Sequence, residues 1–533
     1  MKKIRRIVSF LLTAVMLLSL AACGSPSAPE TDAPAESGNG VIQNDAAIAV
    51  GSTAQQFLGH FDASQYFSTE CSTAAAYLLY DQLFSIGSDG AWYSDILSDY
   101  YWSDETENLL VMTLKDNVYF SNGDQMTASD VLYSLQRFAQ STRGATNFTV
   151  VDFEASSISE DGLTLNLQYN QPYGPWQSGL NIFVMNEDFV ESLPEDTDWY
   201  SADSVCGSGP YAVKDTVMGI SITFEKREEW WMQDEAGDSA SVQEITIYSY
   251  SDDTTMMADY TNGVIDVAIN LSASDCERIA DDSTLGTYVP VNSNATAVIV
   301  LSPENEILKN EDIRKAICLG TDADSIAEMV WGILGTPATS TLNESNPYYV
   351  GGHAYEYDPQ TAAELVAHSG IESPTLTFIT NQDGNATTIA EAFQYCMQEI
   401  GITVDFQPYD QATAVADYWS QPNGTDFYIN AASIATASNE AADVYTFYRE
   451  SFSYTCTRQT DPEILSLLEA GRNTTDEEER AQIYADIQAW FYEHYSMIPI
   501  CQWSTAYAYN SRISTCDIPI TGSPSLRYIT MAG

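Results

Sequence analysis

Basic residues are scarce in this chain. Its 533 residues include 20 lysines and arginines against 75 aspartates and glutamates, which gives a formal net charge of −55. Such an acidic surface repels nucleic acid and anionic lipid headgroups, so we expect neither to be a partner. It also disfavours acidic ligands. For most of these acids, solubility is a sufficient explanation.

Histidine is also scarce, and the common catalytic motifs are lacking. The four histidines are scattered along the chain, which argues against a histidine-rich metal site. The motifs Gly-x4-Gly-Lys-Ser/Thr, Gly-x-Ser-x-Gly and His-Glu-x-x-His do not occur. We expect no enzyme, no metal and no cofactor, although the missing motifs by themselves are only mild evidence against a hydrolase. Because 75 acids guarantee chance pairs, a hydrolase built on two carboxylates stays open, and an activity screen would reveal its turnover.

The nine cysteines lack a Cys-x-x-Cys pair and the spacing of a small disulfide scaffold. Cys501 and Cys516 flank a predicted hairpin and could pair. Free buried thiols are an equally good interpretation. The cysteine pattern therefore leaves the disulfides undecided.

Only one long apolar run is present, over residues 7–22, and four positive charges precede it within the first six residues. It is shorter than the ~20 apolar residues of a spanning helix, and its basic flank is typical of a secretory signal. Leu20-Ala21-Ala22-Cys23 resembles the bacterial lipoprotein cleavage box, in which the cysteine is diacylated and becomes the mature N-terminus. We predict a signal peptide over 1–22 and a lipid on Cys23; ordinary cleavage with an unmodified Cys23 is the alternative.

A flexible tether is predicted over 23–44. Residues 24–44 are rich in Pro, Ser, Ala, Gly and acids and contain no aromatic residue. As a coil they would reach ~25 Å in root-mean-square terms. The protein is thus expected on the extracytoplasmic face of the cell membrane, or in a periplasm. The long tether favours the outer face of a single-membrane cell.

Globular sequence begins near Asp45, and strand and helix patterns then alternate without a 20–50-residue repeat. The clearest unit is a strand at 376–380, a helix, and a strand at 402–406. The helix has an apolar stripe of Ile389, Phe393, Cys396 and Ile400. This β-α-β pattern predicts a right-handed parallel crossover. A helix over 412–419, a strand over 426–431 and a last helix over about 477–494 follow.

Residues 117–138, NVYFSNGDQMTASDVLYSLQRF, have the pattern of a strand, a tight turn and a capped helix, which together form a corner. Val118–Phe120 suits a strand, and Asn122-Gly123 is a strong turn dipeptide. Thr127 is expected to cap a helix, with Asp130 three residues on in a capping box. The buried positions of that helix would be Val131, Leu132, Leu135 and Phe138. We interpret the whole stretch as a structural corner.

The same corner resembles the signature of family 5 extracellular solute-binding proteins, Phe-Ser-x-Gly-x-x-x-Thr-Ala-x-Asp-Val. Other family segments follow in order. They are VCGSGPYAV (205–213, with Ser208 where the family has Thr), REEWW (227–231), NGVIDVAI (262–269), NEDIRKAICLGTD (310–322), YDPQTAAELVAHSG (357–370), 389–406 and 480–500. Because these matches span nearly the whole mature chain, it is identified as a member of this family, the peptide-binding subunits of ABC importers.

The resemblance implies an α/β, two-lobed periplasmic-binding-protein-like fold with an extra α+β subdomain inserted in the first lobe. The expected first lobe covers 45–291, with the inserted subdomain at about 74–199. The second lobe covers 292–500, and 501–533 return to the first lobe. Ligand would bind between the lobes as they close about a hinge.

The resemblance also suggests a ligand site in the loop 432–447. In peptide-binding relatives this loop reads Gly-Trp-x-x-Asp-x-x-Asp/Glu-Pro-x-x-Phe, and its first Asp holds the peptide α-ammonium. The alignment places Glu440 on that position, Asp443 on the second acid and Phe447 on the Phe. Thr436-Ala437 replaces Gly-Trp and Val444 replaces Pro. A different loop shape, another ligand, or a merely solvated Glu440 therefore stays open.

Three aromatic residues, Trp176, Tyr418 and Trp419, are further candidates for a pocket wall, with ordinary packing as the alternative. The expected function is a monomeric, lipid-anchored receptor. It would capture di- or oligopeptides by hinge closure and deliver them to an ABC permease and its ATPase. Alternatives are the same fold binding an oligosaccharide or a metal chelate, or an adhesion or signalling lipoprotein without a transporter.

Overall fold

The structure is a computed structural model. It describes residues 47–53, 59–65, 73–87, 90–103, 108–141, 144, 148–233, 242–301, 306–381, 384–409, 429–434, 440–445, 461–516 and 526–532. The signal peptide, Cys23, the tether, the helix predicted at 412–419 with Tyr418 and Trp419, and Phe447 lie outside the described residues. The strand predicted at 426–431 lies partly outside them.

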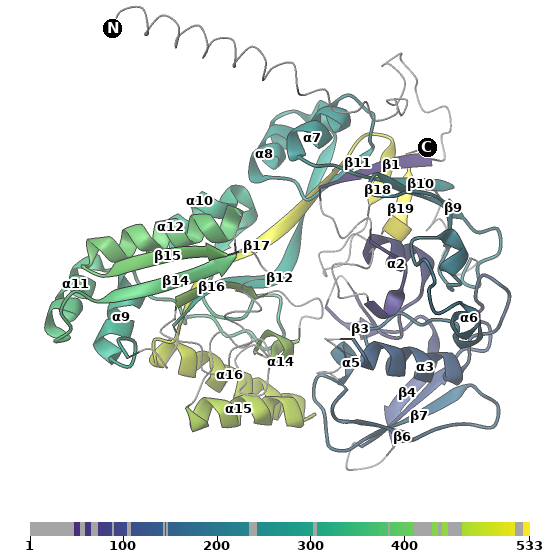
Figure 1. Ribbon diagram of the computed structural model, residues 1–533, viewed down its shortest axis with the longest axis horizontal. Helices are drawn as coiled ribbons and strands as arrows, with labels where there is room; N and C mark the ends of the chain where they lie inside the picture. Colours follow the sequence, from purple (N-terminus) through teal and green to yellow (C-terminus); the bar gives the residue numbers. More distant parts are fainter. Residues whose placement is uncertain are drawn as a thin grey trace, which may run out of the picture. The chain divides into compact units, whose positions relative to one another are not determined.

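One 11-stranded sheet runs through the molecule in the order β15-β14-β16-β12-β17-β11-β1-β10-β9-β8, with β13 (Gly335–Pro337) paired to β17 (Figure 1). Its two longest strands are the antiparallel pair β12 (Thr287–Leu301) and β17 (Met497–Tyr509). The register of this pair shifts between Asn292 and Thr296. The predicted lobe boundaries at 291/292 and 500/501 therefore fall inside two shared strands.

The half of the sheet nearer the N-terminus is mixed. Its strands are β1 (Ala47–Ser52), β8 (Tyr211–Val217), β9 (Ser221–Lys226), β10 (Glu244–Ser249) and β11 (Val267–Ile269), and its helices are α2 (Thr73–Leu79), α7 (Asp253–Thr261) and α8 (Ala273–Asp281). Successive side chains of a strand point to opposite faces. Ile48 and Val50 thus pack on the side of α2, and Ala49 packs on the side of α7 and α8.

The other half contains the predicted crossover. Its elements are β14 (Thr375–Asn381), β15 (Thr403–Tyr409), β16 (Ile429–Ile434), α9 (Glu311–Gly320), α10 (Ala323–Trp331), α11 (Pro359–His368), α12 (Gly384–Glu399), α14 (Ala441–Val444), α15 (Pro462–Asn473) and α16 (Glu477–Glu493). β14 and β15 are parallel, as predicted, and α12 joins them. Ile299 of β12 packs with α9–α12, whereas Val298 and Val300 pack with α14–α16. Helices therefore cover both faces.

A smaller antiparallel sheet, in the order β4-β5-β7-β6, has a hydrophobic core of its own. The elements of this subdomain are β2 (Ser85–Ile86), β3 (Trp92–Tyr93), β4 (Leu97–Trp102), β5 (Leu109–Leu114), β6 (Val151–Ile158), β7 (Thr164–Tyr169), α3 (Ala128–Ala139), α5 (Trp176–Gly179) and α6 (Glu187–Ser192). Leu110 and Leu167 of the sheet and Leu135 of α3 belong to the same buried cluster. Near the C-terminus, β18 (Ile513–Cys516) and β19 (Ile529–Met531) form a hairpin-like pair.

The corner at 117–138 forms largely as predicted. Asp130 accepts hydrogen bonds from the Thr127 amide (2.8 Å) and its hydroxyl (2.9 Å), and α3 begins at Ala128. Gly123 has φ 91°, which the turn requires. Two details differ: the strand expected at 118–120 is a single bridge at Tyr119, and Leu132 is only half-buried. Instead, Phe120 and Val118 pair with residues across the turn: the Phe120 amide donates to the Asp124 carbonyl, and the Met126 amide donates to the Val118 carbonyl, both at 2.9 Å.

Replacing Thr127 with alanine should lower the free energy of unfolding by about 1 kcal/mol, because the cap of α3 loses its hydroxyl. Denaturant-induced unfolding would measure this loss. Solute affinity should stay nearly unchanged, since we place this corner outside the ligand cleft. A tenfold loss of affinity in a folded variant would contradict that placement.

The six described cysteines are buried, and five of them are free thiols: Cys206, Cys276, Cys318, Cys396 and Cys501. The pairing of Cys501 with Cys516 is therefore wrong. Cys501 of β17 packs in the core around α9–α12, whereas Cys516 packs in the core around α2. The two thiols thus belong to different cores. Among the described residues, none of the helices has the length and apolar character needed to cross a membrane.

Candidate functional site

Glu440, the predicted ammonium-binding residue, is buried. It caps the N-terminus of α14, where its carboxylate accepts a hydrogen bond from the Ala442 amide at 2.9 Å. The same oxygen accepts from Arg480 Nη2 at 2.6 Å. The side chains of Arg480 and Glu440 are only 4% and 9% exposed. Glu440 is thus half of a buried ion pair and is not a solvated surface acid.

Arg480 lies between two tyrosine rings and donates hydrogen bonds to two further oxygen atoms. It donates to the Tyr348 hydroxyl (2.6 Å) and to the Gly471 carbonyl (3.3 Å). Its guanidinium carbon lies 4.9 Å from the ring centre of Tyr348 and 5.6 Å from that of Tyr484. Arg480 is the only basic residue of α16, an otherwise acidic and apolar helix. The candidate site residues named from the sequence do not include Arg480, and its isolation is the sequence signal that could identify it.

Each residue of this ion pair affects the pKa of the other. Burial raises the pKa of the Glu440 carboxyl above its ordinary value, although the charge of Arg480 opposes the rise. Burial lowers the pKa of Arg480, but the charge of Glu440 together with Tyr484 and Tyr348 opposes it, and the net pKa is raised above its ordinary value. The guanidinium therefore stays charged and favours the ionised form of Glu440.

Asp443, the second predicted acid, lies one helical turn away on α14 and is half-buried. It accepts a hydrogen bond from the Ser178 hydroxyl, which belongs to α5 of the subdomain. The charge of Asp443 also contributes to the raised pKa of Glu440. The structure thus brings both predicted acids together, one facing α16 and the other facing the subdomain.

Trp176 packs in an aromatic group of the subdomain. Its ring centre lies 5.4 Å from that of Phe84, 6.0 Å from Tyr100 and 5.7 Å from Trp102, all in edge-on arrangements. Such pairs stabilise a core through ring quadrupoles. Trp176 is half-buried and lies two residues before Ser178, so it supports the segment that contacts Asp443.

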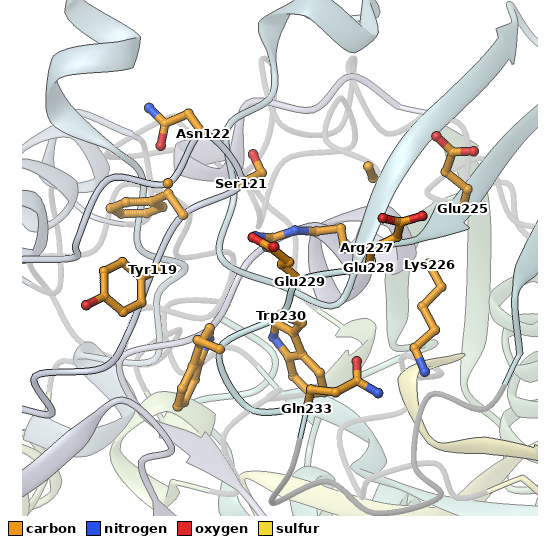
Figure 2. Close-up of a pocket in the computed structure, with 14 residues that line it drawn as sticks. Tyr119, Ser121, Asn122, Glu225, Lys226, Arg227, Glu228, Glu229, Trp230 and Gln233 are labelled. Atoms are coloured by element: carbon orange, nitrogen blue, oxygen red, sulfur yellow. The ribbon is translucent and has the colours of Figure 1, made fainter.

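A separate pocket of about 960 Å³ lies between the turn at 119–123 and the segment 225–233 (Figure 2). Acidic and basic side chains line it, together with the aromatic residues Tyr119, Trp230 and Trp231. Arg227 Nη1 donates a hydrogen bond to the Gly209 carbonyl oxygen at 2.7 Å. None of the predicted site residues lines this pocket. Within the described ranges, no group of three or more His, Cys, Asp or Glu residues could hold a metal ion.

The chain was compared with known proteins. The sequence profile of the bacterial extracellular solute-binding proteins, family 5 (middle region), matches residues 92–455. The glutathione-binding protein GsiB of Salmonella paratyphi A is 21% identical over 467 residues, which cover 86% of this chain and 88% of GsiB. The nickel-binding protein NikA of Staphylococcus aureus is 21% identical over 334 residues, covering 62% of this chain and 64% of NikA.

Among solved structures, the oligopeptide-binding protein AppA of Bacillus subtilis in complex with a nonapeptide superposes with a TM-score of 0.72. It is 18% identical, and the match covers 91% of this chain and 99% of AppA. At this identity the likeness establishes the shared periplasmic-binding-protein fold. Together with the family profile, which spans most of the chain, it shows that this protein belongs to family 5 of the bacterial extracellular solute-binding proteins, a non-enzymatic family that serves ABC transporters.

Proposed function

We propose that the protein is a lipid-anchored receptor that captures a di- or oligopeptide and delivers it to an ABC permease. The family supports solute capture outside the cytoplasm. Two of the relatives support a peptide, because glutathione is a tripeptide and the ligand of the other relative is a nonapeptide. Capture would follow hinge closure about β12 and β17, in which ligand stabilises the closed state.

The observation that carries this proposal is the pair of acids on α14. A free peptide N-terminus is an ammonium, and a closed cleft removes its water. A buried charge is tolerated only beside a close partner, for which a carboxylate is suited. Glu440 and Asp443 supply two carboxylates where the second half of the sheet meets the subdomain. We propose Glu440 as the ammonium partner, with Arg480 keeping it ionised, and Asp443 as the alternative.

Native mass spectrometry of the purified protein would test the ligand class. A bound species whose mass and fragments are those of a peptide would support the proposal. A bound metal chelate would contradict it and favour the second candidate, which the likeness to a nickel-binding protein suggests. A bound oligosaccharide would likewise contradict it. A chain without any solute, and without permease and ATPase genes beside its own, would favour an adhesion or signalling lipoprotein.

The anchor gives a separate prediction. Replacing Cys23 with alanine should move the protein from the membrane fraction to the soluble fraction, because acyl chains supply most of the membrane affinity of such an anchor. The polar, acidic tether would not retain it. Intact-mass measurement should show a diacyl group on wild type and none on the variant. A variant that fractionates entirely with membranes would contradict the lipid anchor.

A further inference from the structure

Among the described residues, the subdomain segment 171–178 contacts the α15–α16 pair. The Gly174 amide donates to the Arg472 carbonyl at 2.8 Å. Gln171 Nε2 donates to Asn473 Oδ1 at 2.9 Å. Arg472 Nη2 donates to the Tyr173 hydroxyl at 3.1 Å, and its guanidinium carbon lies 5.0 Å from the Tyr173 ring centre. These contacts join residues that are about 300 positions apart in the chain.

A further hydrogen bond, from Ser178 to Asp443, belongs to the same contact, which we call the latch. Its two sides belong to different cores. Tyr173 packs with the subdomain sheet, whereas Leu468 of α15 packs with α14 and α16. The latch is therefore a polar contact between separately packed parts. Each hydrogen bond of this kind contributes about 1 kcal/mol net, so the latch can open without unfolding either core.

Gly174 is the position that permits this close approach. A Cβ atom there would lie 2.5 Å from the Thr474 carbonyl oxygen and 2.7 Å from Arg480 Nε. Both distances are well inside van der Waals contact, and the first neighbour is backbone. Gly179, the residue after this segment, is different: a Cβ atom would meet only Tyr173 Cε1, at 3.5 Å. Any side chain at 174 thus forces the two segments apart, whereas alanine fits at 179.

We propose that the latch holds the protein closed before any solute binds, and that Gly174 is a positioning residue that sets solute affinity through this closure. The inference rests on the proposed capture of solute by hinge closure. If only the closed form binds tightly, the apparent affinity falls in proportion to the closed fraction. Asp443 then acts on affinity through its contact with Ser178, in addition to any direct contact with ligand.

The test compares Gly174→Ala with the matched control Gly179→Ala. Small-angle X-ray scattering of the solute-free proteins should show a larger radius of gyration for Gly174→Ala and the wild-type value for Gly179→Ala. Calorimetry with the co-purified solute should show a loss of about tenfold in affinity for Gly174→Ala alone. A wild-type radius of gyration in folded Gly174→Ala would overturn the latch.

A second variant decides the matter if Gly174→Ala does not fold. Gln171→Ala combined with Ser178→Ala removes two side-chain hydrogen bonds of the latch without adding volume. It should also expand the solute-free protein, and an unchanged radius of gyration would overturn the inference. The scattering measurement needs no ligand. If no solute binds wild type while the latch variants expand, the proposed function fails and the latch stands.

Discussion

Replacing Arg480 with methionine is expected to lower the free energy of unfolding by about 3–5 kcal/mol, because Glu440 is left as an unpaired buried charge. Methionine keeps much of the side-chain volume, so the loss reports the charge more than the packing. Arg480 lies 2.6 Å from Glu440, and both side chains are at least nine-tenths buried. Denaturant-induced unfolding monitored by tryptophan fluorescence would measure the difference.

Two controls separate the ion pair from other effects. The double variant Arg480→Met with Glu440→Gln should recover part of the loss, because it removes both charges together. Arg278→Met breaks the exposed pair between Arg278 and Asp275, whose arginine is 48% exposed, and should change stability by at most about 1 kcal/mol. If Arg480→Met were no more destabilising than Arg278→Met, the buried pair would not stabilise the fold.

Replacing Glu440 with glutamine is expected to weaken binding of a free peptide by roughly 2–5 kcal/mol. Glutamine keeps the size and hydrogen-bonding ability of the side chain and removes the charge that would face the ligand ammonium. The variant also removes the buried carboxylate partner of Arg480 and leaves it only the exposed Glu477, at 4.0 Å. Unfolding must therefore be measured in parallel, because a fall in stability could by itself reduce the binding-competent fraction.

Acetylating the peptide N-terminus removes the ammonium without changing the protein, so its effect on affinity is independent of any loss of stability. Calorimetry would compare free and acetylated forms of the co-purified peptide on wild type and on Glu440→Gln. Acetylation should cost wild type roughly 2–5 kcal/mol and cost the variant much less. If Glu440→Gln binds the free peptide as tightly as wild type, Asp443 becomes the residue to test with Asp443→Asn. If acetylation makes no difference to wild type either, the proposed ammonium site is wrong.

Local patterns predicted the elements around the site well. The apolar stripe at 389–400 and its flanking strands gave α12, β14 and β15 with their parallel pairing. The capping box at Thr127 and Asp130 gave the start of α3. Each of these features depends on residues a few positions apart, where the periods of helix and strand decide which side chains share a face. The predicted disulfide between Cys501 and Cys516 is wrong, because the two cysteines are close in the sequence but pack in different cores.

The family, the alternating α/β elements and the two acids at 440 and 443 can all be predicted from the order of residues along the chain. The contacts of those acids cannot, because they form only when distant segments pack together. The partner of Glu440 lies 40 positions away on α16, and that of Asp443 lies 265 positions away in the subdomain. A carboxylate in a loop has the same local pattern whether it is solvated or buried. Its burial, its partner and its pKa depend on which distant helices pack against it, and the path of the chain through the shared strands β12 and β17 sets that packing.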